Sequence, residues 1–250
     1  MFQRVIEITM FRKSKAKEIE RFFTLPLAKN ELAVFYLGVS GFFVRNVDNR
    51  TVLIDPAGLL KKDEISALKA VNLLLFTHDH IDHFRSGATR AIFKATTAPI
   101  LAEAKVIKKL KGKIAYDKLV SAEPGKTYTF GDITATAIQG IHRGPIMLYQ
   151  VRMDALRFFH GGDSGYVSLK EYPSQIAFVP VGGMSPTASP ENAYKMVSDL
   201  KPDIAITMHG SDKQKQQFEQ KVKEAMPQTT VITMESFTTK TISVPTRKSV

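Results

Sequence analysis

Residues 77–83 read Thr-His-Asp-His-Ile-Asp-His and place three imidazoles and two carboxylates within one heptapeptide. Imidazole nitrogen and carboxylate oxygen are ligands that Zn²⁺, Mn²⁺ and Fe²⁺ accept. Alternation at i and i+2 brings two imidazoles to the same side of an extended segment. A His-x-His-x-Asp-His match arises by chance on the order of once in several thousand such sequences. A metal site is therefore favoured over a solvated, histidine-rich loop.

Two of the remaining histidines follow expected strands and stand beside glycine. His142 comes after a strand expected over residues 133–139, and His209 follows one expected over residues 204–208. Side chains at strand ends project from a rigid scaffold into loops, where preorganised ligands are usually placed. An isolated histidine is more often a packed or surface residue, but the shared position of these two favours metal binding.

Asp163 is a further candidate ligand, because it follows an apolar strand and has glycines on both sides. Glycine lets the backbone approach closely, so this carboxylate could bridge two cations, although Gly-Asp-Ser alone is more often a turn. Asp55 and Asp79 could support ligand imidazoles from behind, and Asp55-Pro is equally well explained as a strand-ending turn. His160 lies inside an apolar strand, which favours packing or support of a ligand over ligation.

Short apolar or alternating segments separated by turn residues predict a series of strands. These strands are expected over residues 32–37, 41–47, 51–54, 72–76, 133–139, 147–153, 156–160, 176–181, 204–208, 230–234 and 239–244. Helices are expected over residues 15–23, 62–71, 86–96, 102–111, 190–200 and 212–225. Strands dominate the middle and strand-helix alternation returns towards the end, which predicts two mixed sheets packed together with helices outside.

The composition is that of an ordinary globular protein, with 44% hydrophobic and 24% charged residues. We expect a single domain over residues 1–250, with residues 1–30 as a helical N-terminal extension. No apolar run approaches the roughly 18 to 20 residues of a membrane span, and the charged N-terminus lacks the apolar core of a signal peptide. A cytoplasmic protein without a membrane partner is expected. Since the chain has no Cys, any metal must be held by His and carboxylate.

The formal net charge of +11 could attract polyanions. Lysines and arginines concentrate over residues 13–21 and 105–113, where a solvated helix face explains them at least as well as a nucleic-acid surface does. The expected partner is a small-molecule substrate, with nucleic acid and a homo-oligomer left open. Arg143 could contact an anionic group of the substrate, because a guanidinium forks onto phosphate or carboxylate. A plain surface arginine is the other interpretation of this residue.

The candidate metal residues occur in the chain order Asp55, heptapeptide 77–83, His142, Asp163 and His209. This order resembles the five sequence motifs of the metallo-β-lactamase-fold hydrolase superfamily, and the resemblance spans roughly residues 35 to 210.

Within that superfamily, the sequence is most similar to the L-ascorbate-6-phosphate lactonase branch. The similarity lies in the Leu-Gly-Val-Ser opening at residues 37–40, the His-Asp-His-x-Asp-His form and the Gly-Gly-Asp-Ser turn. Many relatives of this branch carry His where this chain has Val39. True β-lactamases commonly use a Cys ligand, so antibiotic hydrolysis is not expected of a chain without Cys.

The resemblance implies an α+β fold, a four-layer αββα sandwich that holds its metals in loops at one edge of the sheets. By motif position, the first metal would be held by His78, His80 and His142. The second would be held by Asp82, His83 and His209, with Asp163 bridging the two. Zinc or manganese is expected, and iron also suits a set made only of His and Asp.

Two divalent ions that share an oxygen lower the pKa of bound water from near 16 towards about 7. We therefore expect a metal-bridging hydroxide, steered by Asp82 and Asp163, to attack a small ester, a lactone or a phosphoester. The alternative is a phosphodiesterase or nuclease acting on nucleotides or nucleic acid, which the basic charge favours. A metal-binding scaffold without turnover is a third interpretation.

Overall fold

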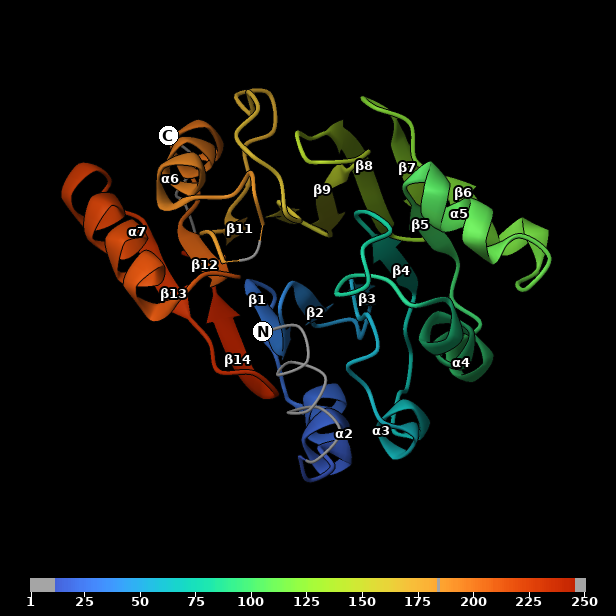
Figure 1. The fold of residues 1–250 in the computed structure, drawn as a ribbon. Helices are drawn as coiled ribbons and strands as arrows, with labels where there is room; N and C mark the ends of the chain where they lie inside the picture. Colours follow the sequence, from blue (N-terminus) through green and yellow to red (C-terminus); the bar gives the residue numbers. More distant parts are fainter. Residues whose placement is uncertain (1–11, 184, 246–250) are drawn as a thin grey trace.

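The computed structural model describes residues 12–183 and 185–245, which form two seven-stranded sheets packed face to face (Figure 1). The first sheet has the order β14-β1-β2-β3-β4-β5-β6. Its strands are β1 (Glu31–Gly38), β2 (Gly41–Arg45), β3 (Thr51–Ile54), β4 (Leu73–Phe76), β5 (Ile100–Ala102), β6 (Leu119–Ser121) and β14 (Thr238–Ser243). Pairs are antiparallel from β14 to β3 and parallel from β3 to β6.

The second sheet repeats this arrangement with the order β13-β12-β11-β10-β9-β8-β7. Its strands are β7 (Thr127–Phe130), β8 (Ile133–Gln139), β9 (Met147–Met153), β10 (Leu156–His160), β11 (Ile176–Pro180), β12 (Ile204–Met208) and β13 (Thr230–Thr233). Pairs are antiparallel from β7 to β10 and parallel from β10 to β13. Both sheets are therefore mixed, as the sequence predicts.

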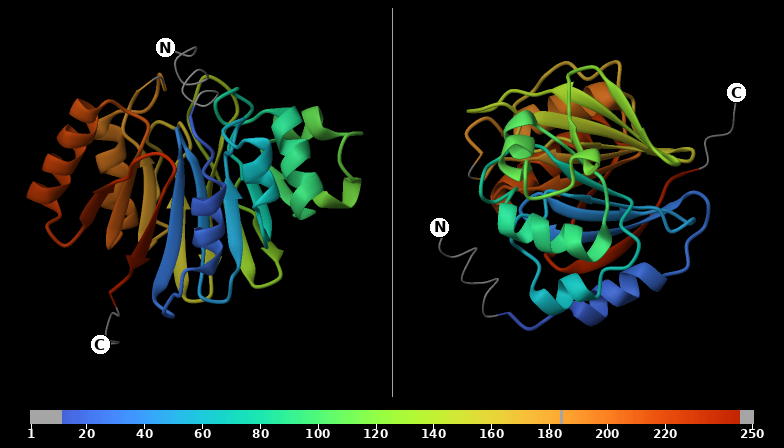
Figure 2. Two further views of the ribbon diagram at one scale, coloured as in Figure 1. Left: turned by 90° about the horizontal axis from the view of Figure 1, so that it is seen from below. Right: turned by 90° about the vertical axis from the view of Figure 1, so that its right-hand side faces the viewer.

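Helices cover the outer faces of both sheets (Figures 1 and 2). The first sheet carries α2 (Ala16–Thr24), α3 (Lys62–Ser66), α4 (Ser86–Thr96) and α5 (Ala104–Leu110). The second carries α6 (Pro190–Leu200) and α7 (Asp212–Ala225), and the short 3-10 helix η1 (Tyr116–Lys118) precedes β6. In the described part of the chain, no helix combines the length and the apolarity that crossing a bilayer requires.

Three apolar layers separate these four structural layers. Between the sheets, Phe42 of β2 packs on Phe178 of β11 with ring centroids 4.5 Å apart. A second layer joins the first sheet to its helices, and there Phe22 of α2 lies against Phe43. The third contains Phe218 of α7, fully buried under the second sheet. Because α2 buries its aromatic face in this way, it belongs to the outer helical layer.

The expected αββα sandwich is confirmed. Residues 1–11 of the expected extension lie outside the described residues.

Several element predictions need correction. The strands β5, β6 and β7 were not expected; β5 is only three residues long, and β6 and β7 are short strands with partly exposed side chains at or near sheet edges, where the apolar pattern is weak. The helix expected over 62–71 ends at Ser66, and Leu68 is buried without continuing it. The helix expected over 102–111 starts at Ala104, because the Glu103 side chain accepts a hydrogen bond from the Lys105 backbone N–H and caps it.

Candidate metal centre

The heptapeptide leaves the end of β4, a strand buried on both faces. The backbone N–H groups of His83 and Phe84 both donate to the His80 carbonyl, at 3.0 and 2.8 Å, so the chain closes one helical turn. This turn folds His83 back beneath His78, with ring centroids 4.1 Å apart. The Phe84 ring packs edge-on against Phe76 and holds the turn on the sheet. Three imidazoles from seven residues therefore face one region.

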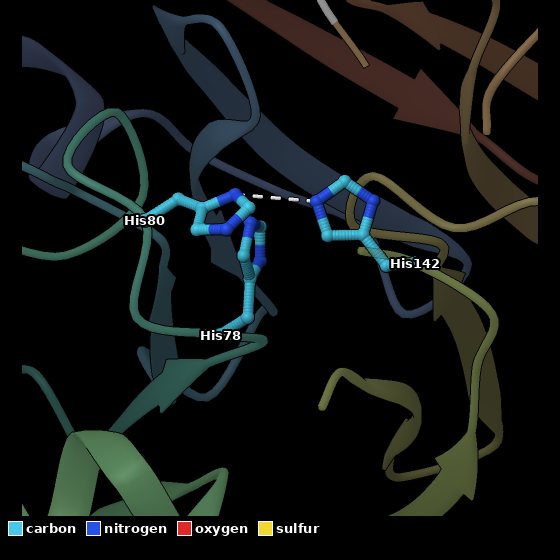
Figure 3. Close-up of side chains that lie close together, drawn as sticks. All are labelled: His78, His80 and His142. Atoms are coloured by element: carbon cyan, nitrogen blue, oxygen red, sulfur yellow. Dashed lines mark hydrogen bonds between the residues drawn. The ribbon is translucent and has the colours of Figure 1, made fainter. Parts of the chain in front are cut away.

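His142 reaches the heptapeptide from the loop after β8. Its Nε2 lies 3.2 Å from His80 Nδ1 (Figure 3). One ring nitrogen each from His78, His80 and His142 lies within 4.8 Å of the others. We call these three residues the outer half-site, because His80 is exposed and His142 is half-buried. They are the residues expected to hold the first metal.

Asp163 lies between two imidazoles on the buried side of the centre. Its Oδ1 is 3.0 Å from His83 Nε2 and 2.6 Å from His209 Nε2. The side chains of His83, Asp163 and His209 are 0%, 5% and 6% exposed, and we call them the inner half-site. Asp82 lies beside it, with Oδ2 4.0 Å from His83 Nε2. His78 joins the two half-sites, since its ligand atom also lies within 4.8 Å of those of His83 and Asp163.

The buried donor atoms of this centre lack hydrogen-bond partners among the described residues. They are His78 Nε2, His83 Nε2, Asp163 Oδ1 and His209 Nε2. Asp163 Oδ1 and His83 Nε2, 3.0 Å apart, form an ion pair while the imidazole is protonated. Imidazole nitrogen and carboxylate oxygen atoms that converge in this way are the donor set of a divalent cation such as Zn²⁺ or Mn²⁺. The residues present therefore fit the metals that the sequence suggests.

Hydrogen bonds behind two of the imidazoles assign their tautomers. The Thr77 hydroxyl has one proton and lies 2.6 Å from Asp55 Oδ2, an atom that can only accept. Its lone pair therefore faces His78 Nδ1, 3.0 Å away, which must carry the hydrogen. His83 Nδ1 likewise donates to Asp55 Oδ2 at 2.8 Å. Both rings thus keep a hydrogen on Nδ1, which leaves Nε2 as the atom that could bind a cation.

Charges at the inner half-site shift the pKa values of its members in opposite directions. Burial lowers the pKa of His83, but the adjacent Asp163 and Asp55 carboxylates outweigh it and hold that pKa well above the ordinary value. Burial likewise raises the pKa of Asp163, while His83 and His209 outweigh it and keep that pKa well below the ordinary range. Before metal binds, the inner half-site therefore favours a positive imidazole beside a negative carboxylate.

His160 lies behind the centre, fully buried in β10. Gly162 N donates to its Nδ1 at 3.3 Å, and its Nε2 donates to the Ser40 carbonyl at 3.0 Å. The Ser40 hydroxyl in turn lies 3.1 Å from His83 Nδ1. Burial lowers the pKa of His160 to about 4, so the ring is neutral at pH 7. Its two hydrogen bonds therefore link it to the backbone of Ser40 and of Gly162, the residue before Asp163.

Asp79 and Arg143 stand apart from the converging donors. The Asp79 carboxylate lies 2.6 Å from Lys109 Nζ on α5, which anchors the heptapeptide to that helix. This contact differs from the expected support of a ligand imidazole. Arg143 is exposed one residue beyond His142, and it forms no ion pair within the part of the chain that the structure describes. Its contact with substrate stays a prediction.

Sequence reasoning missed several residues that hold the centre in place. Thr77 and Ser40 lie directly behind imidazoles of the candidate centre, and Thr187 Oγ1 lies 3.0 Å from His142 Nδ1. The only sequence signal for Thr77 and Ser40 is their place in the heptapeptide and in the opening at residues 37–40. Val39 adopts φ 58°, a strained conformation for a β-branched residue, and its carbonyl accepts from His209 N at 3.2 Å.

Comparison with known proteins identifies the family. Residues 33–209 match the family model described as a beta-lactamase superfamily domain. A UPF0173 protein of Pyrococcus abyssi is 32% identical over 165 residues, which cover 64% of this chain and 74% of that protein. A UPF0173 metal-dependent hydrolase of Polynucleobacter asymbioticus is 23% identical over 217 residues, which cover 73% and 75% of the two chains.

A solved structure shows the same fold. Igni18, a metallo hydrolase from the hyperthermophilic archaeon Ignicoccus hospitalis, superimposes with a TM-score of 0.72 at 22% identity, over 86% of this chain and all of that one. The family model spans well over half of the sequence, and named relatives are metal-dependent hydrolases. The chain therefore belongs to the beta-lactamase superfamily domain family and is a metal-dependent hydrolase with the metallo-β-lactamase fold.

Proposed function

We propose that this chain is a dinuclear hydrolase of small esters, lactones or phosphoesters. One observation carries the proposal: the unpartnered donor atoms of both half-sites converge around Asp163 Oδ1, which lies within 3.0 Å of two imidazoles. A carboxylate with that placement suits two cations better than one. Zinc or manganese suits the donor set best, and iron is compatible with it.

When bound, two divalent cations supply a hydroxide nucleophile at neutral pH and polarise the bond under attack. The residues of the chain hold the cations and orient the attacking oxygen. Asp163 bridges the half-sites, and the buried ring of His83 is held in orientation by Asp55. Asp82, half-buried beside His83, lies where its carboxylate can steer the attacking oxygen and accept its proton.

The substrate enters from the outer half-site, since His80 is exposed and His142 half-buried, whereas the inner residues are closed off. Arg143 follows His142 and could bind an anionic group of the substrate. Val39 stands beside His209 where many members of the L-ascorbate-6-phosphate lactonase branch carry His. Because an isopropyl group cannot donate a hydrogen bond, we expect the preferred substrate to differ from that lactone.

Elemental analysis coupled to a hydrolysis screen tests the proposal. The purified protein and its Asp163→Asn variant are loaded with Zn²⁺ or Mn²⁺, and bound metal is counted. Both are then assayed on chromogenic lactones, carboxylic esters, phosphomonoesters and phosphodiesters. We expect two ions per chain and turnover in the parent protein alone. A single ion per chain with full activity, or equal turnover by the variant, contradicts the proposal.

A phosphodiesterase or nuclease is the second candidate, and the position of α5 favours it. The Lys109–Asp79 contact brings this helix, with its exposed lysines, beside the heptapeptide. A polyanionic substrate bound there releases counterions, so its affinity falls steeply with salt. Binding of an oligonucleotide that weakens by orders of magnitude between 50 and 200 mM salt supports this candidate. Turnover of a neutral lactone that is indifferent to salt supports the first.

A further inference from the structure

We propose that Thr187 is a positioning residue that fixes the tautomer of His142 and so presents its Nε2 to the outer half-site. The inference rests on the proposed function, in which His142 is a metal ligand. Thr187 lies in the loop between β11 and α6, a segment far along the chain from the heptapeptide.

Two hydrogen bonds of the Thr187 hydroxyl determine which nitrogen of His142 carries the hydrogen. Thr187 Oγ1 donates to the Asp163 carbonyl at 2.8 Å. A carbonyl can only accept, and a hydroxyl has a single proton. The contact of 3.0 Å between Thr187 Oγ1 and His142 Nδ1 must therefore be donated by the imidazole. His142 thus carries its hydrogen on Nδ1.

With the hydrogen on Nδ1, the Nε2 of His142 presents a lone pair to the outer half-site. This atom lies 3.2 Å from His80 Nδ1 and faces the ligand group that His78 completes. The opposite tautomer would direct an N–H at that position, where no cation could be bound. Thr77 acts on His78 by the same logic, so hydroxyl groups from two distant segments set two rings of one half-site.

Neighbouring contacts hold Thr187 where this bond requires it. Asn192, in the first turn of α6, donates from its side chain to the Thr187 carbonyl at 2.7 Å. The Ser185 hydroxyl donates to the same Asp163 carbonyl at 2.7 Å. Gly165 lets the loop approach, since a Cβ there would lie 3.2 Å from the Thr187 carbonyl oxygen. One segment therefore contacts both a ligand of the outer half-site and the backbone of the bridging aspartate.

The test compares Thr187→Val, which keeps the shape and loses the hydroxyl, with Thr187→Ser, which keeps the hydroxyl. Loss of such a supporting hydrogen bond typically costs 10–100-fold in metal affinity. We expect the Zn²⁺ affinity of the outer half-site to fall by about that factor in Thr187→Val. In Thr187→Ser this affinity should stay within a few-fold of that of the parent protein. Ser198→Ala is the control, because the Ser198 hydroxyl donates within α6 to the Tyr194 carbonyl at 2.9 Å, away from the metal centre.

The tautomer is read directly from ¹⁵N chemical shifts of His142 in metal-free protein at a pH where the ring is neutral. We expect the Nδ1–H form in the parent protein, Thr187→Ser and Ser198→Ala, and a mixture of forms in Thr187→Val. An Nε2–H form in the parent protein overturns the inference, even if Thr187→Val does not fold. Unchanged tautomer and Zn²⁺ affinity in a folded Thr187→Val also overturns it.

His142→Ala separates this inference from the proposed function. If His142→Ala binds two ions as tightly as the parent protein, the proposed ligand set is wrong. If His142→Ala loses an ion while Thr187→Val does not, only the role of Thr187 is wrong.

Discussion

The two halves of the metal centre differ in burial and in what supports them. The inner half-site is closed to solvent, and its His83 is hydrogen-bonded to the Asp55 carboxylate. The outer half-site opens to solvent at His80. Its other two rings, His78 and His142, are hydrogen-bonded to the hydroxyls of Thr77 and Thr187. A carboxylate behind an imidazole raises its basicity more than a neutral hydroxyl does.

Because of this difference, we expect the two half-sites to have different roles. The inner half-site offers the Asp163 carboxylate and two imidazoles shielded from water, where attraction to a cation is strong, so we expect it to hold its ion more tightly. The exposed outer ligands can adjust and leave room for a substrate. We therefore expect the buried, charged support to belong to the more tightly bound ion, and the neutral, more open support to belong to an ion that meets substrate.

Asp163→Asn should have the largest effect, because Asp163 is expected to bridge both half-sites. An amide offers one neutral oxygen in place of two charged ones, so both ions are expected to be lost on dialysis. Metal content per chain measures this loss. Asp79→Asn is the control, since Asp79 is paired with Lys109 and should retain both ions. Normal two-ion content in Asp163→Asn would show that Asp163 does not bridge the two half-sites.

His142→Ala should affect only the outer half-site. One ion is expected to be lost, while the ion between His83 and His209 stays. Titration with a chelator followed by metal analysis distinguishes the two, since the parent protein should release its ions in two steps and the variant in the later step alone. Loss of both ions together would show that the half-sites do not bind independently.

Asp55→Asn should weaken the inner half-site without removing a ligand. The carboxylate accepts from the Thr77 backbone N–H with one oxygen and from His83 Nδ1 with the other, and an amide has only one oxygen and no charge. We expect a loss of about 10–100-fold in affinity for the more tightly bound ion, measured by competition with a chelator. Weakening of the looser ion instead would reverse the assignment of the two affinities.

His160→Gln should have the smallest effect, visible only as a pH dependence of stability. The pKa of His160 is lowered to about 4 in the folded protein, so below its ordinary value of 6.5 only the unfolded chain takes up this proton. The free energy of unfolding should then fall by about 1 kcal/mol from this residue between pH 7.5 and 5.5. Denaturant titrations of metal-free protein should show a shallower fall in the variant. If the free energy of unfolding falls equally with pH in the parent protein and the variant, His160 is not held neutral in the folded state.

Several features followed from the sequence because their signals are local. The heptapeptide concentrates metal-binding side chains within a few positions, and alternating or helical patterns marked most of the long elements. The resemblance in motif order extended this to the αββα sandwich and to the family. Edge strands such as β6 and β7 were missed, because short and partly exposed segments carry little pattern.

Tertiary structure alone decided how the centre is supported. Asp55 and Asp79 were equivalent candidates in the sequence, yet the fold turns one to His83 and the other to Lys109. No sequence pattern linked Thr187 to His142, and the fold brings these two residues into contact although they are 45 positions apart. Residue types and local spacing determine which chemistry is available, whereas the direction of each hydrogen bond depends on which distant segments pack together.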